Sequence, residues 1–482
     1  MRRRTTSLLL ALLLAAPASA QQPAREPTSY DRAIAAGYKA LTLCSAMFNG
    51  TGRTQAQIEA LELTGIYPEY DAIVPTLRAE VHSFMTRPGD RRQSPQRHAA
   101  VVEVPFDQSA PPRRATWQVD RGCTLEPIGQ YREESPGMVT VLDMPPAFAG
   151  SRDDRPWPAG DRMRSVRTSR FLAAVEGKAF DGASYGAGRT TATIIVHDGR
   201  IVAERYAAGF GIHTAQRTWS VAKSIAGTLI GMAVGDRTLG VGHSDRVRIP
   251  EWRDSRGNIR LDDLLRMASG LYSATAGNRT DAVYFGGTSV TDEIAYWPRI
   301  AESGTRFRYA NNDILAAVRV LRAALNNDDA YAAFPRSRLF APLSMTRTVA
   351  ETDHQGNFIL SSQVWSTARD LARLGQFWLQ DGVWEGRRLL PEGWMAYMTR
   401  ASGPQPASGP GYGATLWLFG PGQGLPAGSY AAQGNRGQYV MVVPSRRLVI
   451  VRRGEDAAGT RFDIARFTAD VIAALPAEGA RR

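Results

Sequence analysis

Two β-hairpin patterns lie far apart in this chain of 482 residues, and the stretch between them reads mostly as helix and loop. In the first, Thr191–Tyr206 alternates apolar and polar residues around Asp198-Gly199, a pair that favours a tight two-residue turn. In the second, Gln438–Arg452 alternates about Pro444–Arg447, and a helix over Thr460–Leu475 is predicted to follow. Because this order is not a repeating βαβ pattern, it predicts an α+β fold, with an antiparallel sheet flanked by helices and a helical lobe.

Residues 1–20 read as a secretory signal. Arg2–Arg4 form a basic end, Leu8–Ala16 an apolar core and Ala18–Ala20 a small-residue cleavage site. The apolar core is too short to span a bilayer, and no later stretch reaches the roughly 20 apolar residues that a transmembrane helix needs. No cysteine follows the cleavage site to carry a lipid. We therefore expect an exported protein, periplasmic or secreted, without a stable membrane anchor.

The rest of the chain divides into an N-terminal accessory region, residues 21–150, and a larger body, residues 169–478, that carries the chemistry. Residues 151–168, which continue a proline-rich stretch, are interpreted as a linker between them. The accessory region is predicted to contain two helices and two strands: Tyr30–Phe48, Gln55–Leu63, Ala99–Val104 and Ala115–Val119.

Nucleic acid is not an expected partner, although the chain has a formal net charge of +12. Removing residues 1–20 takes away three arginines and no acid, which leaves about +9. The arginines are scattered in short runs such as Arg113-Arg114 and Arg446-Arg447, without a lysine-rich or aromatic-interleaved patch. The six histidines show no metal-ligand spacing, so neither a metal nor another cofactor is expected.

Cys44 and Cys123 are the two cysteines of the chain. In an exported protein a pair of cysteines favours a disulfide, and two ligands are too few for a structural metal. Two buried free thiols are the alternative. We expect a Cys44–Cys123 disulfide.

The strongest catalytic signal is a serine and a lysine three residues apart, Ser220 and Lys223, at the start of an apolar helical pattern. That spacing is nearly one helical turn, so both side chains lie on one face. Burial by the apolar residues that follow would lower the pKa of the amine and let it accept the serine proton. The chain has only three lysines, Lys39, Lys178 and Lys223, and arginine cannot take this role. The plainer alternative is a serine N-cap followed by a lysine that reaches solvent.

A second candidate nucleophile, Ser184, lies in Gly182–Gly186, which matches the G-x-S-x-G pattern. That motif needs a strand before it and a helix after it, whereas here a strand pattern follows at Thr191. Ser184 is therefore not expected to be catalytic.

The segment Ser303–Asp313 places Tyr309 and Asn311 on a turn ahead of a predicted helix over Ile314–Leu325. Alone it reads as an N-capped helix with a packed aromatic residue. Taken with Ser220-x-x-Lys223, its Tyr-x-Asn order resembles the serine β-lactamase and penicillin-binding-protein superfamily, and within it the class C-like serine hydrolases.

Two further segments, Leu264–Leu271 and Trp365–Arg373, resemble parts of the same superfamily. The resemblance covers about residues 170–475. The branch that this sequence resembles most is that of the 6-aminohexanoate-dimer hydrolases and related esterases.

The resemblance implies that Ser220 attacks a carbonyl carbon and forms an acyl-enzyme, while Lys223 and Tyr309 handle the protons. It also implies that Asn311 orients Lys223 or the substrate amide. The oxyanion would be held by the backbone N–H of Ser220 and by another from the strand end at Gly434-Asn435. The expected function is that of an exported serine hydrolase that cleaves a small-molecule ester or amide without a cofactor.

One motif departs from the family pattern. Ala432 stands where the family's Lys-Thr-Gly or His-Thr-Gly motif has its cation, within Ala431–Gln438. In the family that cation helps to hold a substrate carboxylate, so its loss favours uncharged short-chain esters or amides over β-lactams. Arg436 is a candidate to replace the charge.

Two alternative functions remain open. One is a true β-lactamase or D-alanyl carboxypeptidase. The other is a catalytically silent cell-wall or peptide-binding protein on the same fold, which would have no need of a buried amine at Lys223.

Overall fold

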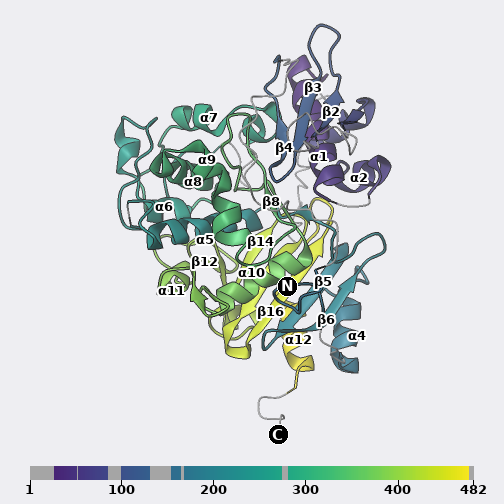
Figure 1. The fold of residues 1–482 in the computed structure, drawn as a ribbon, viewed down its shortest axis with the longest axis vertical. Helices are drawn as coiled ribbons and strands as arrows, with labels where there is room; N and C mark the ends of the chain where they lie inside the picture. Colours follow the sequence, from purple (N-terminus) through teal and green to yellow (C-terminus); the bar gives the residue numbers. More distant parts are fainter. Residues whose placement is uncertain are drawn as a thin grey trace, which may run out of the picture.

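The computed structural model describes residues 26–50, 53–84, 99–130, 153–163, 168–240, 242–273 and 280–476. Figure 1 shows the N-terminal region at the top, a helical lobe at the left and a large sheet in the lower part of the molecule. The signal expected over residues 1–20 lies outside the described residues. Within the described ranges, no helix is both long enough and apolar enough to cross a membrane.

The largest sheet has seven strands in the order β12-β13-β14-β15-β16-β5-β6, and every neighbouring pair is antiparallel. The strands are β5 (Thr190–His197), β6 (Arg200–Tyr206), β12 (Gly411–Tyr412), β13 (Trp417–Phe419), β14 (Ser429–Gly434), β15 (Gln438–Val443) and β16 (Leu448–Gly454). Ile195 of β5 lies opposite Ile450 of β16, so the two predicted hairpins pair with each other although they are far apart in the chain. Asp198 and Gly199 both have positive φ, 52° and 72°, as the predicted turn requires.

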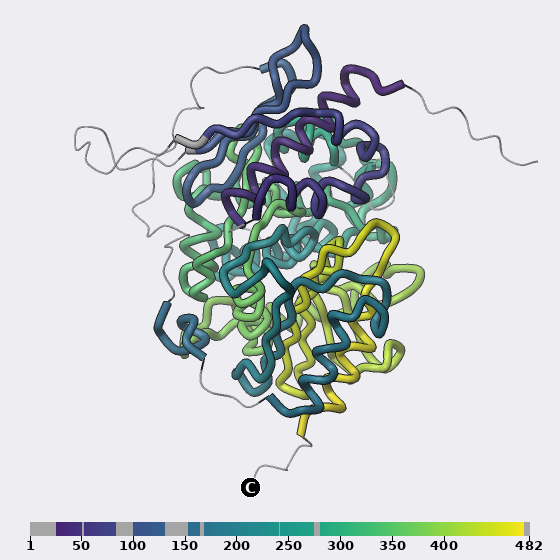
Figure 2. The backbone as a smooth tube through the Cα atoms, turned by 90° about the vertical axis from the view of Figure 1, so that its right-hand side faces the viewer, coloured from purple at the N-terminus to yellow at the C-terminus, as the bar shows by residue number. Residues whose placement is uncertain are grey.

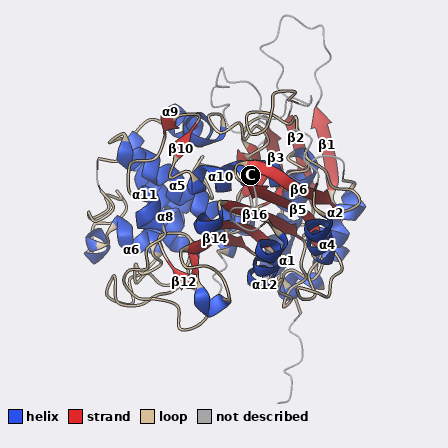
Figure 3. Ribbon diagram, turned by 90° about the horizontal axis from the view of Figure 1, so that it is seen from below, coloured by secondary structure: helices blue, strands red, loops and turns tan. Residues whose placement is uncertain are grey.

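This sheet separates two cores, because successive side chains of a strand point to opposite faces. Val440 and Val451 face the core that contains α5 (Val221–Gly235) and α10 (Ala368–Leu379). Met441 and Ile450 face the other core, against α4 (Arg170–Lys178) and α12 (Ile464–Ala474). Figure 3 shows the strands as a layer with the helical lobe gathered on one side.

The helical lobe follows α5 in the chain. Its helices and short helical turns are η2 (Ser255–Asn258), α6 (Leu261–Leu265), η3 (Ala282–Gly286), α7 (Val290–Tyr296), α8 (Asn311–Leu325), α9 (Asp328–Pro335), η4 (Arg336–Phe340) and α11 (Trp394–Met398). Short strands form a three-stranded sheet in the order β7 (Gln216–Arg217), β9 (Val364–Ser366), β8 (Val349–Ala350), and a two-stranded one, β10 (Val383–Trp384) with β11 (Arg387–Arg388). The lobe and the sheet confirm the predicted α+β fold.

The N-terminal region forms its own antiparallel sheet in the order β1-β2-β3-β4, packed against a helix. Its elements are α1 (Ser29–Phe48), α2 (Gln55–Glu62), α3 (Pro68–Asp71), η1 (Val74–Thr76), β1 (Glu80–Phe84), β2 (Ala99–Val104), β3 (Arg113–Gln118) and β4 (Gly122–Leu125). Buried residues of α1 and β2 belong to the same apolar cluster as α5 and α10. Figure 2 shows this region, in purple and blue, seated on the rest of the molecule. It therefore shares a core with the body.

Covalent and polar contacts reinforce this union. The expected disulfide between Cys44 and Cys123 is confirmed, and it joins α1 to β4. Beside it, Glu351 of the body accepts hydrogen bonds from Ser45 Oγ at 2.7 Å and Asn49 Nδ2 at 2.6 Å. Arg113 is buried and donates from Nη1 to the carbonyl of Phe285 at 2.9 Å.

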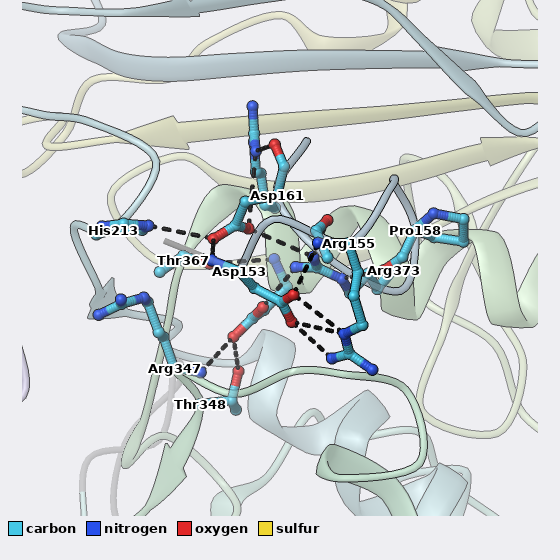
Figure 4. Close-up of polar contacts among 12 residues, drawn as sticks. Asp153, Arg155, Pro158, Asp161, His213, Arg347, Thr348, Thr367 and Arg373 are labelled. Atoms are coloured by element: carbon cyan, nitrogen blue, oxygen red, sulfur yellow. Dashed lines mark hydrogen bonds and ion pairs between the residues drawn. The ribbon is translucent and has the colours of Figure 1, made fainter. Parts of the chain in front are cut away.

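Residues 153–163, most of the described part of the 151–168 segment, lie against the start of α10 (Figure 4). Arg373 donates to the carbonyls of Pro158 at 2.7 Å and Gly160 at 2.8 Å, and Asp161 lies 3.2 Å from His213. Arg373 also lies over the ring of Trp157, 4.9 Å from its centroid. These contacts hold the segment to the body.

Two predicted helix starts differ from the structure, and two strands were not predicted. The last helix begins at Ile464 rather than Thr460, because Asp463 caps it by accepting from the N–H of Arg466. The helix after Tyr309 begins at Asn311 rather than Ile314, which places Asn311 in its first turn. Strands β1 and β4 were not predicted; β4 has four residues, too few to show an alternating pattern.

Candidate active site

Ser220 is the N-cap of α5 and is half-buried, and the residue before it has an unusual backbone. Trp219 has φ 51°, a left-handed value that a bulky side chain rarely adopts. Thr218, which follows β7, donates its N–H to the carbonyl of Val364 at 2.7 Å. The chain thus turns sharply from β7 into α5 and presents Ser220 at the helix start, where backbone N–H groups have no intrahelical acceptor.

Lys223 lies one turn into α5 and is 1% exposed. Its Nζ is 2.9 Å from Ser220 Oγ, 2.7 Å from Asn311 Oδ1 and 2.8 Å from the carbonyl oxygen of Ser361. Burial, and secondarily the positive charge of Arg217, lowers the pKa of Lys223 to about 7. The amine is therefore poised to exchange a proton near neutral pH, and the alternative of a lysine reaching solvent is wrong.

Tyr309 brings its hydroxyl to the same serine from the segment before α8. Burial raises the pKa of the Tyr309 phenol above its ordinary value, although the hydrogen bond with Ser220 works in the opposite direction. Its ring packs on Tyr412 and Trp417, with centroids 6.0 Å and 5.4 Å away, and Lys223 Nζ lies 5.0 Å from its centroid. Tyr309 is thus held as a neutral phenol beside Ser220 and Lys223.

The end of β14 approaches the Ser220 turn closely. A Cβ at Gly434 would lie 2.3 Å from the carbonyl oxygen of Thr218 and 3.1 Å from Cβ of Trp219, so a glycine is needed there. Asn435 follows at an exposed position, and its side chain accepts from the N–H of Arg436 at 2.9 Å. The structure therefore brings Gly434 and Asn435 next to the start of α5.

The missing cation at Ala432 is not replaced by Arg436. Ala432 is fully buried in the core shared with α5. Arg436 is 7% exposed and directs Nη2 to the carbonyl of Leu61 at 2.5 Å and Nε to that of Asp456 at 3.2 Å. Arg436 is occupied in binding the N-terminal region to the sheet.

Several side chains around the site have no signal in the local sequence. Ser361, whose carbonyl binds Lys223, lies in a loop whose position depends on the whole lobe. Tyr284 donates to or accepts from Ser361 Oγ at 2.6 Å. Arg217 lies three positions before Ser220 in a stretch of mostly polar residues, so its local sequence gives no signal either. Ser184 is half-buried and donates from Oγ to Asp181 Oδ2 at 2.5 Å, outside this group.

A comparison with known protein families agrees with this fold. A family profile described as Beta-lactamase matches residues 178–473, more than half of the chain. The chain therefore belongs to the beta-lactamase family and is a hydrolase of that fold.

Individual relatives place it within that family. It is 26% identical, over 331 residues, to the 6-aminohexanoate-dimer hydrolase of Paenarthrobacter ureafaciens, covering 64% of this chain and 79% of the relative. A penicillin-binding protein homologue from Caulobacter crescentus has a similar fold, with a TM-score of 0.51 and 15% identity over 65% of this chain and all of that one. A Bacillus anthracis protein, named only provisionally as a 6-aminohexanoate-dimer hydrolase, gives a TM-score of 0.52 and 21% identity over 62% of this chain and 80% of its own.

Proposed function

We propose that this chain is a serine hydrolase that cleaves a small ester or amide through an acyl-enzyme on Ser220. The observation that carries the proposal is the buried Lys223 amine, 2.9 Å from Ser220 Oγ and with a pKa lowered by burial to about 7. An unprotonated amine at that distance can take the serine proton as the nucleophile attacks. A binding protein gains nothing from burying an amine beside a hydroxyl.

In the first half-reaction, Ser220 Oγ bonds to the substrate carbonyl carbon as its proton passes to Lys223. The negative charge on the carbonyl oxygen is stabilised by backbone N–H groups of Ser220 and Asn435. The C–O or C–N bond then breaks, and the proton reaches the leaving alcohol or amine through the Tyr309 hydroxyl. Water attacks the acyl-enzyme, gives one proton back to Ser220 Oγ by way of Lys223, and releases the carboxylic acid.

Uncharged, short substrates are the proposed class. Ala432 offers no cation, and the guanidinium of Arg436 is bound to Leu61 and Asp456. A substrate carboxylate therefore lacks the charge-assisted hydrogen bond that the family motif supplies, typically about 1.5–3 kcal/mol of recognition. The name of the Paenarthrobacter relative adds linear amides to the substrates to be tried.

The mechanism is tested by Ser220→Ala, assayed with p-nitrophenyl acetate and labelled with a fluorophosphonate probe read by intact mass. We expect loss of both hydrolysis and labelling, with an unchanged unfolding temperature. Ser184→Ala is the matched control, because Ser184 is the other candidate nucleophile, and it should keep both. Hydrolysis that persists in Ser220→Ala would contradict the proposal.

The substrate class is tested by comparing a p-nitrophenyl ester, a linear amide and a chromogenic cephalosporin on the wild type and on Arg436→Ala. We expect the ester to be cleaved faster than the cephalosporin, and the ratio to be unchanged in Arg436→Ala. A faster cephalosporin reaction that disappears in Arg436→Ala would show that Arg436 anchors the carboxylate.

We also propose export to the periplasm or beyond, on the pattern of residues 1–20. The Cys44–Cys123 disulfide supports an oxidising compartment. Intact mass of the protein recovered from a cell fraction tests this, with cleavage after Ala20 expected. A full-length cytoplasmic chain would contradict it.

A further inference from the structure

Arg217 occupies a fixed position close to the candidate nucleophile. It ends β7, where it pairs with Trp365 of β9, and its carbonyl accepts from Arg453 Nη2 at 3.1 Å. Its residue exposure is 6%. The backbone on both sides is held, so the side chain leaves from a rigid point three residues before Ser220.

The guanidinium of Arg217 has few partners for a buried charge. Nη2 donates to Ser362 Oγ at 2.7 Å, and Cζ lies 3.9 Å from the ring centroid of Trp219. Its Nε is buried without a hydrogen-bond acceptor, and no carboxylate of the described residues lies within ion-pair distance. By contrast, the buried Arg452 pairs with Asp456 at 2.8 Å. Arg217 therefore has no ion-pair partner among the described residues, although its charge also acts on the buried carboxyl of Glu351.

That charge is brought near Lys223 by two adjacent residues. The carbonyl of Ser361 accepts from Lys223 Nζ, and the hydroxyl of Ser362 accepts from Arg217. Tyr284 closes this group, with its hydroxyl 2.6 Å from Ser361 Oγ and its ring centroid 5.8 Å from the Arg217 guanidinium. Two like charges in a poorly solvated region repel each other, so the protonated form of Lys223 is disfavoured.

Other charges on the elements around α5 are compensated or far along the helix. Asp313 of α8 accepts from Ser269 Oγ at 2.7 Å, and Arg338 of η4 pairs with Asp236 at the opposite end of α5. The remaining titratable groups on neighbouring elements are phenols or paired arginines: Tyr430 of β14, Tyr439 of β15, Arg319 and Arg322 of α8, and Arg336 of η4. Of these charged groups, Arg217 is the one that acts on Lys223.

We propose that Arg217 is a positioning residue for the reaction, a buried positive charge that keeps the Lys223 amine unprotonated and ready to accept the serine proton. The inference rests on the proposed function. It also gives a role to the N-terminal region. Tyr67 of that region packs on Trp219, with ring centroids 6.3 Å apart, and so holds the surface on which Arg217 lies.

The experiment compares Arg217→Gln and Arg217→Lys with the wild type. The first readout is the pH dependence of kcat/KM for p-nitrophenyl acetate. The second does not need activity: because the chain has only three lysines, ¹³Cε-labelled lysine gives few NMR signals, and Lys223→Arg identifies the one from Lys223. Arg338→Gln removes a positive charge from the far end of α5 and is the matched control.

In Arg217→Gln we expect the rising limb of the kcat/KM profile, and the Lys223 titration midpoint, to move up by about one pH unit, as expected for removing a nearby like charge. At pH 7 the rate should fall about fivefold and recover at pH 9. Arg217→Lys and Arg338→Gln should keep the wild-type midpoint.

An equal loss of rate at every pH, with an unchanged Lys223 midpoint, would give Arg217 a purely structural role and overturn the inference. A higher KM confined to carboxylate-bearing substrates, again with an unchanged midpoint, would make it a substrate anchor and also overturn it. If Ser220→Ala keeps its activity while the Lys223 midpoint still moves in Arg217→Gln, the proposed function fails. The inferred repulsion between Arg217 and protonated Lys223 then still stands.

Discussion

Lys223 and Tyr309 are each held by contacts other than the one with Ser220 Oγ. Lys223 has three oxygen neighbours, of which only one is Ser220 Oγ. Tyr309 is packed by two aromatic rings. Because side chains fixed in this way lose little further freedom on reaction, their geometry favours proton transfer.

Replacing Tyr309 with phenylalanine removes the hydroxyl and keeps the ring contacts. We expect kcat to fall by about 10²–10⁴-fold, the usual contribution of a general acid or base, with little change in unfolding temperature. Tyr412→Phe is the matched control, because Tyr412 belongs to the same ring cluster. Kinetics with p-nitrophenyl acetate and thermal unfolding test this. A similar loss in both variants would mean that the cluster's packing, rather than the Tyr309 hydroxyl, sets the rate.

At the scale of elements, the site depends on how closely β14 approaches the start of α5. Gly434 makes this approach possible, because any Cβ there meets the carbonyl of Thr218. The backbone groups proposed to bind the oxyanion lie at the end of β14 and at the start of α5.

Gly434→Ala should push the end of β14 away from the Ser220 turn. We expect kcat to fall by at least about tenfold, up to the 10²–10³-fold typical of a lost oxyanion donor. Gly420→Ala is the control, because Gly420 is extended, with φ −175°, and a Cβ there meets nothing within 4 Å. Steady-state kinetics of both variants decide the matter. Full activity in Gly434→Ala would contradict the prediction, because it would mean that the end of β14 does not help to form the oxyanion site.

At the scale of the whole molecule, the N-terminal region and the body behave as one unit. Their apolar residues form a common cluster, and Glu351 of the body is enclosed by Ser45, Asn49 and Cys123 of the N-terminal region. Burial raises the pKa of Glu351 to about 7, although these donors oppose the rise. A carboxyl group at this junction makes the union of the two regions sensitive to pH.

Between about pH 4.5 and 7 the folded state keeps a proton on Glu351 that the unfolded chain releases, so stability should fall as pH rises. We expect the unfolding temperature of the wild type to decrease from pH 5 to pH 8, and the decrease to be smaller in Glu351→Gln. Glu392→Gln, at an exposed position, should show the same change of unfolding temperature with pH as the wild type. Calorimetry at several pH values tests this. The same decrease of unfolding temperature with pH in the wild type and in Glu351→Gln would contradict it.

Local patterns in the sequence were enough to predict the two hairpins, the start of helix α5 at Ser220 and the Cys44–Cys123 disulfide. The hairpins follow from the residues of the turns, and the helix start follows from the spacing of apolar side chains, both within a short stretch of chain. The disulfide follows from the number of cysteines and the expected compartment. Only the tertiary structure placed Ser361 and Arg217 beside Lys223, turned Arg436 away, and joined the N-terminal region to the core. These features depend on contacts between residues far apart in the chain, and such contacts leave no periodic or local signal.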